Sequence, residues 1–572
     1  MRLFEMDVFE RIKVYLDELE GECIKRCFLE IVSGAKRGNQ EAMLEVVEKY
    51  VQGSQRGAEL VVYKPRISDS LVTEKMAEFL LWFGEVDERA VWLEADGYED
   101  YSKGWGDDWT WEYEDNQGIG AKVERAFLFA KDCVNDRKYE SALQILEWLI
   151  RMEVDVRSDY NDDDEMSLEI DDLVDEGLVK VDLKEMALLT LYSAYQIAGV
   201  SERAGNLYAY FTNPFTERLF IDVPVEDIMR RVGREYLKDE AVFWQDWIAL
   251  LAGKSGDLEA RLLRKALLFS RGAGGLADEA RRSGKMHPAL FLDALIEYKV
   301  SRDYHKMVDL GEEAVASLAQ NLPIRSKIAL KTASAHYELG QDEEMKRLWY
   351  EAYLSNQSEV NYLRLFITDE LMKQYGMMAK DSLKNVSVPT LQFLAGEFDK
   401  VRQACVNPPN SLGWSGNFIG TGIRLFLLYL YSEDELDAAS KSLAGDIAYE
   451  FRFKFKTNEE FTYLEKEAFI DISDGTAVWW YAFKKWRQHF PMSEMDKQNI
   501  LLWLEEIIAQ RVTAIVDGQF RRHYESVAQL LATLGSVKEF QGQIDAKQEL
   551  KESFKQKFPR HSSFTAELNK YF

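Results

Sequence analysis

Residues 323–357 read PIRSKIALKTASAHYELGQDEEMKRLWYEAYLSNQ, and this stretch contains the pattern that decides the fold. Pro323 is placed to open a helix, because its fixed φ suits the first helical turn. Gly340 marks a tight turn, and a second helical pattern begins after it. Ala333 and Ala352 are small residues within the two patterns, where they would let antiparallel helices approach closely. We therefore predict a helical hairpin with both alanines buried where the helices cross.

Elements of this hairpin recur along the chain. Met345 follows the turn glycine by five residues, and the pairs Gly199 with Ala204 and Gly396 with Val401 repeat that step. The hairpin resembles the tetratricopeptide-like (TPR-like) superfamily of helical repeats. The resemblance is best over 323–357 and fainter over 122–152, 183–211, 288–318 and 391–405. It implies a curved stack of helix pairs that holds a peptide or a partner protein. The alternative is an irregular all-helical domain.

Helical periodicity extends over most of the 572 residues, and only 10 prolines interrupt it. We expect an all-α fold, an irregular TPR-like solenoid with helical N- and C-terminal regions. Its regions are 1–120, which ends in an acidic-aromatic loop, the repeat region 121–385, and the C-terminal region 386–572. The expected helical runs are 41–51, 70–83, 122–134, 139–152, 183–197, 240–251, 258–269, 288–300, 304–318, 324–339, 343–354, 497–516 and 524–534.

The segment 91–120 breaks the helical pattern, because it is rich in tryptophan, tyrosine and acidic residues. We expect a long loop or a small irregular substructure there. Its rings either fold back onto neighbouring helices or stay exposed and anchor a partner, since Trp and Tyr dominate binding hot spots. This segment is the candidate partner site, and its candidate residues are Trp105, Trp109, Trp111, Asp107 and Asp108.

Two other segments carry aromatic patterns. Residues 451–456 alternate phenylalanine with arginine or lysine, which predicts a short strand whose rings face a core. Trp479, Trp480, Phe483 and Trp486 are spaced as in a helix that is buried on most sides. We interpret both as structural features, because a stacking platform for nucleic acid would need outward-facing rings.

Charge restricts the class of partner. The chain has 71 lysines and arginines against 99 aspartates and glutamates, a net charge of −28. This field repels nucleic-acid phosphates and anionic lipids. No secretory signal or membrane-spanning stretch is recognisable, and four cysteines are too few for a disulfide framework. We expect a cytoplasmic protein that binds another protein or a peptide, without membrane or nucleic acid.

Catalytic and metal-binding patterns are incomplete. Ser415 lies in Gly413-Trp414-Ser415-Gly416-Asn417, but a nucleophile elbow would require glycine at 417 and a preceding buried strand. His336 and His523 each begin an H-x-E triplet, yet the P-C-x-x-C of zinc deaminases is missing. We interpret both triplets as helix-surface features. The sequence predicts no metal site and no cofactor.

These observations favour a non-enzymatic protein–protein interaction module, such as a scaffold, an adaptor or a regulatory subunit. Its partner would bind on a helical-repeat surface. The alternative is an enzyme, a carboxylate-rich hydrolase or nuclease with a site built from scattered residues. A pocket where several carboxylates converge with shifted pKa values would favour that alternative.

Overall fold

Helices dominate the structure, a computed structural model that describes residues 67–99, 109–158, 166–231, 239–383, 386–406, 412–414, 417–453 and 462–572. The four strands among them are only 8, 6, 5 and 4 residues long. The prediction of a mainly helical fold is therefore confirmed. The expected helices within 1–66 lie outside the described residues. The chain divides into two compact units, Met1–Leu276 and Ala277–Phe572.

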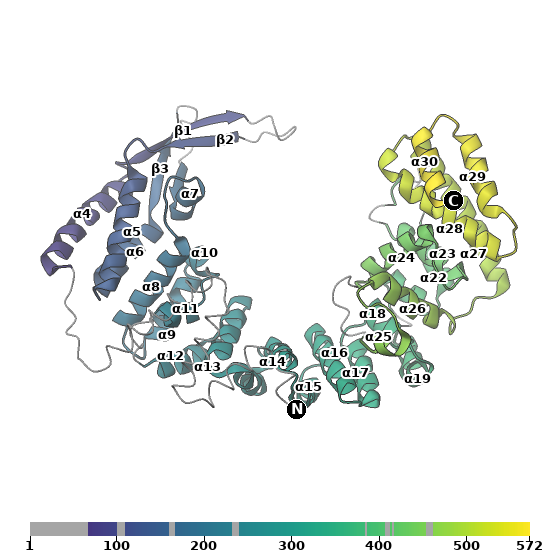
Figure 1. Ribbon diagram of the computed structural model, residues 1–572, viewed down its shortest axis with the longest axis horizontal. Coiled ribbons are helices and arrows are strands. Elements are labelled where there is room, and N and C mark those ends of the chain that lie inside the picture. Colours follow the sequence, from purple (N-terminus) through teal and green to yellow (C-terminus); the bar gives the residue numbers. More distant parts are fainter. Residues whose placement is uncertain are drawn as a thin grey trace, which may run out of the picture. The chain divides into compact units, whose positions relative to one another are not determined.

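The first unit combines helices with a small sheet (Figure 1). Its elements are α4 (Asp69–Asp87), β1 (Trp92–Glu99), β2 (Trp109–Glu114), α5 (Ile119–Asn135), α6 (Tyr139–Arg151), β3 (Glu153–Arg157), β4 (Met166–Glu169), α7 (Ile170–Asp175), α8 (Leu183–Ile197), α9 (Arg203–Thr212), α10 (Glu217–Phe220), α11 (Glu226–Arg231), α12 (Glu240–Ala252) and most of α13 (Asp257–Ser283).

The sheet has the strand order β2-β1-β3-β4. β1 runs parallel to β3, and the two outer pairs are antiparallel. Leu93, Ala95, Val154 and Val156 are buried at alternate positions, so one face of the sheet belongs to the core. α4 contacts both β3 and α6.

The expected loop over 91–120 is corrected by this sheet. Residues 92–99 and 109–114 form an antiparallel strand pair, and α5 begins at Ile119. The physical reason is the alternation of polar residues with apolar or aromatic ones in both strands, which suits a half-buried sheet. Residues 100–108 lie outside the described residues.

Consecutive helices of this unit pack on one another. α5 contacts α6, α6 contacts α8, and α8 contacts α9. Ala142 and Ala204, small residues on α6 and α9, are buried.

Helix α13 is interrupted at Gly272, whose φ of 63° and ψ of −163° are not helical. The glycines of residues 272–275 predict a loop between helices. The structure instead has a break at one residue, with helix on either side of it. Glycine adopts this backbone conformation without the clash that a side chain would cause.

The second unit is helical throughout its described residues (Figure 1). After the end of α13, its elements are α14 (Ala289–Val300), α15 (Tyr304–Ser317), α16 (Pro323–Glu338), α17 (Asp342–Ser355), α18 (Glu359–Arg364), α19 (Asp369–Leu371), the π-helical turn η3 (Met372–Gly376), α20 (Met377–Ser382), α21 (Pro389–Leu394), α22 (Phe398–Ala404), α23 (Ile419–Leu430), α24 (Ala438–Glu450), α25 (Thr462–Ala468), α26 (Gly475–Arg487), α27 (Glu494–Asp517), the 3₁₀ turn η6 (Arg521–His523), α28 (Tyr524–Phe540), α29 (Ala546–Lys557) and α30 (Ser562–Tyr571).

The hairpin α16–α17 forms where the sequence predicted it. Pro323 is the first residue of α16, and Gly340 turns the chain with φ of +71°. The connection is so short that the two contacting helices must run antiparallel. Ala333 and Ala352 have no exposed surface, so their predicted burial is confirmed.

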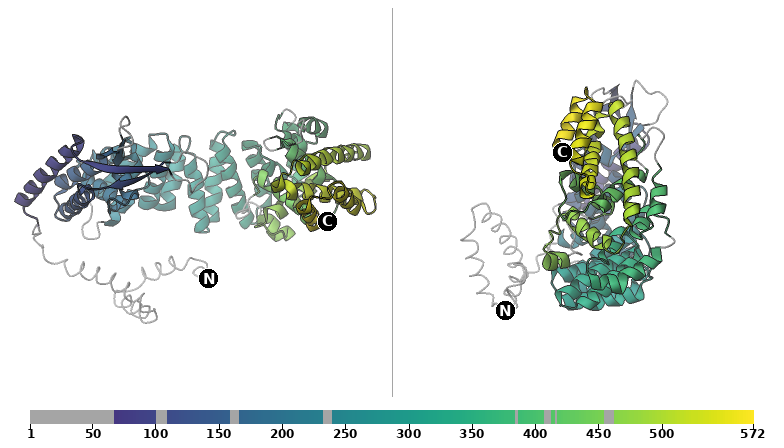
Figure 2. Two further views of the ribbon diagram at one scale, coloured as in Figure 1. Left: turned by 90° about the horizontal axis from the view of Figure 1, so that it is seen from above. Right: turned by 90° about the vertical axis from the view of Figure 1, so that its right-hand side faces the viewer.

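Aromatic residues fill the core around α26. Trp479 and Trp486 are fully buried, as predicted, and Trp479 stacks on Phe483 with ring centroids 4.7 Å apart. The C-terminal helices α29 and α30 both contact α28, as the yellow ribbons of Figure 2 show.

The strand predicted over 451–456 is wrong where the structure describes it. α24 continues to Glu450, Phe451 caps that helix, and Arg452 turns with φ of +63°. Phe451 and Phe453 are nevertheless buried, as expected of their rings. Residues 454–456 lie outside the described residues. Alternation alone did not distinguish a strand from a helix end followed by a turn.

None of the helices in the described ranges combines the length and the apolar character that crossing a bilayer requires.

Candidate functional site

Two of the five predicted partner residues lie on strand β2. Trp109 is opposite Glu99 of β1, and Trp111 is opposite Gly97. Trp111 is half-buried, so its ring is neither fully covered nor fully exposed, the two alternatives that the sequence left open. The other three candidates, Trp105, Asp107 and Asp108, lie outside the described residues.

Strand β2 is an edge of the sheet. Its only neighbour in the described part of the sheet is β1, so the backbone groups on its other side lack a strand partner there. An edge strand is a template for pairing with an extended segment of another chain. β4, the opposite edge, is four residues long and runs directly into α7.

The two faces of β2 differ in chemistry. Trp111 and Tyr113 are half-buried, and they share the face of the buried residue Ala95. Burial raises the pKa of Tyr113, and the negative charges of Glu176 and Asp172 raise it further, which places this ring near α7. Aromatic side chains therefore line the covered face.

The open face carries like charges directly opposite each other. Glu94 pairs with Glu114 and Asp96 with Glu112, and all four side chains are exposed. Asn116 donates from Nδ2 to Glu94 Oε2 at 2.9 Å. Like charges at opposed positions of a strand pair oppose folding. We call Glu94, Asp96, Glu112 and Glu114 the acidic edge. Their mutual repulsion opposes folding, least at Glu94, because Arg157 of β3 lies opposite Glu94 in the sheet register.

Sequence reasoning did not select Glu94 or Asp96. The signal was present, because Leu93-Glu94-Ala95-Asp96 and Trp111-Glu112-Tyr113-Glu114 both alternate with period two. The register that places the carboxylates opposite one another depends on tertiary pairing, which no local pattern fixes.

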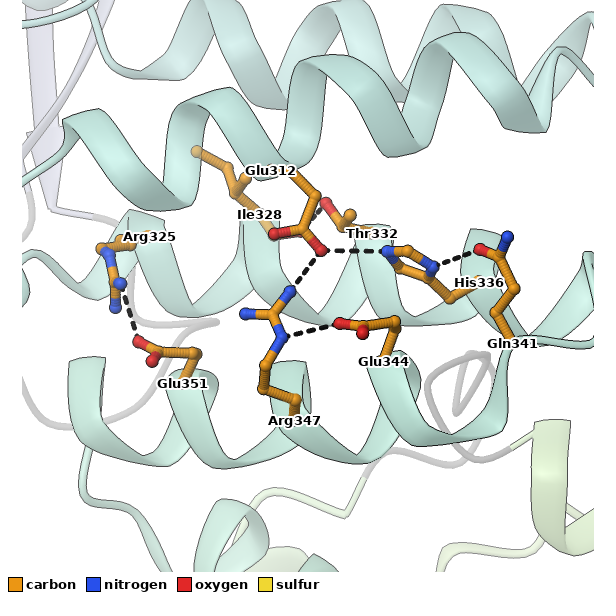
Figure 3. A network of polar contacts seen from close by, with 9 residues as sticks. All are labelled: Glu312, Arg325, Ile328, Thr332, His336, Gln341, Glu344, Arg347 and Glu351. Carbon is orange, nitrogen blue, oxygen red and sulfur yellow. Dashed lines mark hydrogen bonds and ion pairs between the residues drawn. The ribbon is translucent and has the colours of Figure 1, made fainter.

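A second polar constellation joins α15, α16 and α17 (Figure 3). Glu312 Oε1 lies 3.0 Å from His336 Nε2 and also accepts a hydrogen bond from Arg347. His336 Nδ1 lies 2.6 Å from Gln341 Oε1. Arg347 also donates from Nε to Glu344 Oε2 at 2.8 Å. These contacts connect three consecutive helices through one carboxylate.

The contacts of this network favour the ionised forms of Glu312 and His336. The hydrogen bond from His336 lowers the pKa of Glu312 more than burial raises it, and Arg347 lowers it further. Burial alone would lower the pKa of His336, but its hydrogen bonds with Glu312 and Gln341 raise it above the ordinary value. His336 is buried, so its interpretation as a helix-surface residue is corrected: the imidazole fills the contact between helices.

Arg325 forms a parallel set of contacts in the same layer (Figure 3). Its Nη2 donates to Glu351 Oε2 at 2.7 Å, its Nη1 to Ser355 Oγ at 2.6 Å, and its Nε to Val315 O at 2.9 Å. Because each nitrogen has an acceptor, the buried guanidinium is well satisfied. Both sets join α15, α16 and α17.

Among the described residues, no three histidine, cysteine or acidic side chains are arranged to hold a metal ion. Ser415, the serine that was compared with a catalytic nucleophile, lies outside the described residues.

No protein-family model matches this chain, and neither a curated protein nor a solved structure shows significant similarity to it.

Proposed function

We propose that this protein is a non-enzymatic protein–protein interaction module, a scaffold, adaptor or regulatory subunit, that binds a basic segment of a partner protein. The single observation that supports this proposal is the acidic edge beside the open side of β2. An extended basic peptide would add a strand to β2 and place its cations against the opposed carboxylates.

The helical hairpins motivate a separate proposal about the architecture. α14 to α17 pack consecutively, and α16–α17 has the small buried residues typical of TPR-like hairpins. We propose a TPR-like arrangement that offers a further surface to the partner. We also propose a cytoplasmic location, since Cys133 and Cys405 are buried free thiols, as in proteins of reducing compartments.

The test is photo-cross-linking in native cells with a photoreactive amino acid at position 116 of the full chain, an exposed position beside Glu94 and Glu114. Cross-linked peptides identified by mass spectrometry should come from a basic segment of one dominant partner. Capture should weaken for Glu112→Gln and persist for Glu74→Gln, which removes the same charge from an exposed position of α4. Equal capture by the two variants would contradict the acidic edge as the binding surface.

Stability gives an independent readout. Glu112→Gln removes one of two opposed like charges, so it should raise the free energy of unfolding by about 0.2–1 kcal/mol while it weakens capture. A variant that loses capture because it is damaged would be less stable instead.

The sequence also allowed a carboxylate-rich hydrolase or nuclease. What happens to the captured molecule distinguishes this enzyme from a binding module. A binding module retains its partner intact at a fixed stoichiometry. A hydrolase would release cleaved product, and Glu112→Gln would then stop cleavage while binding continued.

A further inference from the structure

The second unit contains a cavity of about 560 Å³ between α23, α24, α27, η6 and α28. Its wall includes the side chains of Arg424, Arg511 and His523, which come from three different elements. The volume lies in the range of sites for small molecules. None of these residues belongs to the acidic edge or to the network of Figure 3.

Two guanidinium groups converge at this cavity. Arg511 is buried, and burial lowers its pKa, with the positive charge of Arg424 as the next cause. Bringing two cations together in a partly buried place opposes folding. An anion between them would offset that cost, and it would do so in a chain whose net charge is −28.

Both arginines are held in place by their neighbours. Arg511 Nη1 donates to Leu412 O at 2.6 Å, and its guanidinium lies 5.0 Å from the ring centroid of Trp414. Arg424 Nε forms an ion pair with the exposed Asp446, 3.3 Å from its Oδ2, but the geometry completes no hydrogen bond to this buried nitrogen. Positioned guanidinium groups are the usual means of recognising phosphate through several hydrogen bonds.

His523 also lines the cavity. Burial lowers its pKa, and the charges of Arg522 and Arg511 lower it further. His523 Nε2 accepts a hydrogen bond from Arg522 Nε at 3.1 Å, so the ring proton is on Nδ1.

The other residues that line the cavity offer a hydrogen-bond acceptor and apolar surface. Glu450 is exposed, and both of its carboxylate oxygens accept from Thr421 Oγ1, at 2.8 and 2.9 Å. This carboxylate would accept from hydroxyl groups and would repel a second anionic group. Phe418 and Leu530 add apolar surface.

We propose that this cavity binds a small phosphorylated molecule that also carries hydroxyl groups, with its phosphate between Arg424 and Arg511. The chemical class is that of sugar phosphates and nucleoside monophosphates. A bare phosphate ion would fill only part of the cavity, so the organic body contributes to affinity through Glu450 and Phe418. The proposal does not depend on the proposed partner-binding function.

The experiment is isothermal titration of the full chain with three probes: inorganic phosphate, ribose 5-phosphate and adenosine monophosphate. We expect saturable binding with a stoichiometry of one for at least one organic probe, and competition by inorganic phosphate at higher concentration. The difference in affinity between ribose 5-phosphate and adenosine monophosphate shows whether the cavity recognises the sugar alone or also a base.

Variants locate the site. Arg424→Gln should weaken binding at least tenfold, while Arg560→Gln, the same change at an exposed arginine of the same unit, should leave it unchanged. Ser526→Phe should block binding by filling the cavity without a change of charge. A thermal melt of each variant checks that it is folded. If Arg424→Gln fails to fold, the loss or retention of binding by Ser526→Phe tests the site instead.

Two results would overturn the proposal. One is the absence of saturable binding by all three probes to the unmodified chain. The other is equal affinity of the folded cavity variants and Arg560→Gln, which would place any observed binding elsewhere.

Discussion

His336 has an oxygen acceptor beside each ring nitrogen, Glu312 Oε1 on Nε2 and Gln341 Oε1 on Nδ1. With the amide of Gln341 in this orientation, only the imidazolium form donates to both. Glu344 and Arg347 of α17 also act on this pair. The network is thus a pH-dependent contribution to stability at the contact of α15, α16 and α17.

The sign of that dependence follows from the two pKa directions. The raised pKa of His336 contributes stability that is complete below about pH 6.5 and is lost as pH rises through the folded-state value. The lowered pKa of Glu312 contributes stability that is present above about pH 4.5 and is lost as pH falls through its folded-state value. The network therefore contributes most between these limits.

His336→Gln should accordingly destabilise the protein more at pH 6 than at pH 8.5. At pH 6 we expect the substitution to lower the free energy of unfolding by about 1 kcal/mol or more. Chemical denaturation at the two pH values measures this difference. His305→Gln, at an exposed histidine of α15, is the matched control and should show no such pH dependence. An equal cost of His336→Gln at both pH values would mean that folding leaves the pKa of His336 unchanged.

For single residues, the sequence predicted which side chains are buried better than it predicted which polar side chains come together. Ala333, Ala352 and Trp479 were expected in the core because small and aromatic residues at helical spacing are typical of helix contacts. Arg424, Arg511 and the buried position of His336 were not predicted. Their partners come from segments up to about a hundred residues away, and no spacing along the chain encodes such contacts.

At the element scale, helix α13 depends on the backbone of one glycine. Gly272 adopts φ of 63° and ψ of −163°, a region almost restricted to glycine, and a methyl group added there would meet no neighbouring atom. Gly272→Ala should cost about 1–3 kcal/mol through backbone strain alone. Gly274→Ala, two residues on, also meets no neighbour but has no positive φ, so it should be neutral or stabilising.

Differential scanning calorimetry of the two variants makes this comparison. A loss of stability shared by Gly272→Ala and Gly274→Ala would indicate that helix packing around the break, rather than the φ of Gly272, is the constraint.

The hairpin α16–α17 depends on small side chains at its crossing. Ala333→Leu and Ala352→Leu add volume where both alanines have no exposed surface, so each should cost about 1–3 kcal/mol. Ala316→Leu, at an exposed position of α15, should change stability by less than about 0.5 kcal/mol. Melting curves unaffected by the two buried substitutions would show that these helices can separate without loss of stability.

Helices were predictable as elements because their periodicity is local. The structure places α8 at Leu183–Ile197 and α16 within one residue of the predicted bounds. The sheet was missed for the opposite reason. Glu94 of β1 pairs with Arg157 of β3 across the whole of β2, α5 and α6, so this pairing is tertiary. Tertiary pairing also created the candidate site at β2.

For the molecule as a whole, net charge is the dominant long-range term. At −28, mutual repulsion opposes the compact state, and dissolved salt weakens that repulsion over distances of about 10 Å at 0.1 M. We expect the melting temperature to rise as sodium chloride increases from about 20 to about 200 mM. Sucrose of equal osmolality separates screening from solute exclusion. A falling melting temperature would mean that ion pairs outweigh the repulsion.

The acidic edge has a consequence for the behaviour of many copies in solution. An unprotected edge strand invites pairing between identical molecules, and this is how ordered aggregates begin. Glu112 and Glu114 are exposed on β2, so two copies that approached edge to edge would bring carboxylates against carboxylates. The charges that would attract a basic partner would therefore also oppose edge-to-edge pairing of identical molecules.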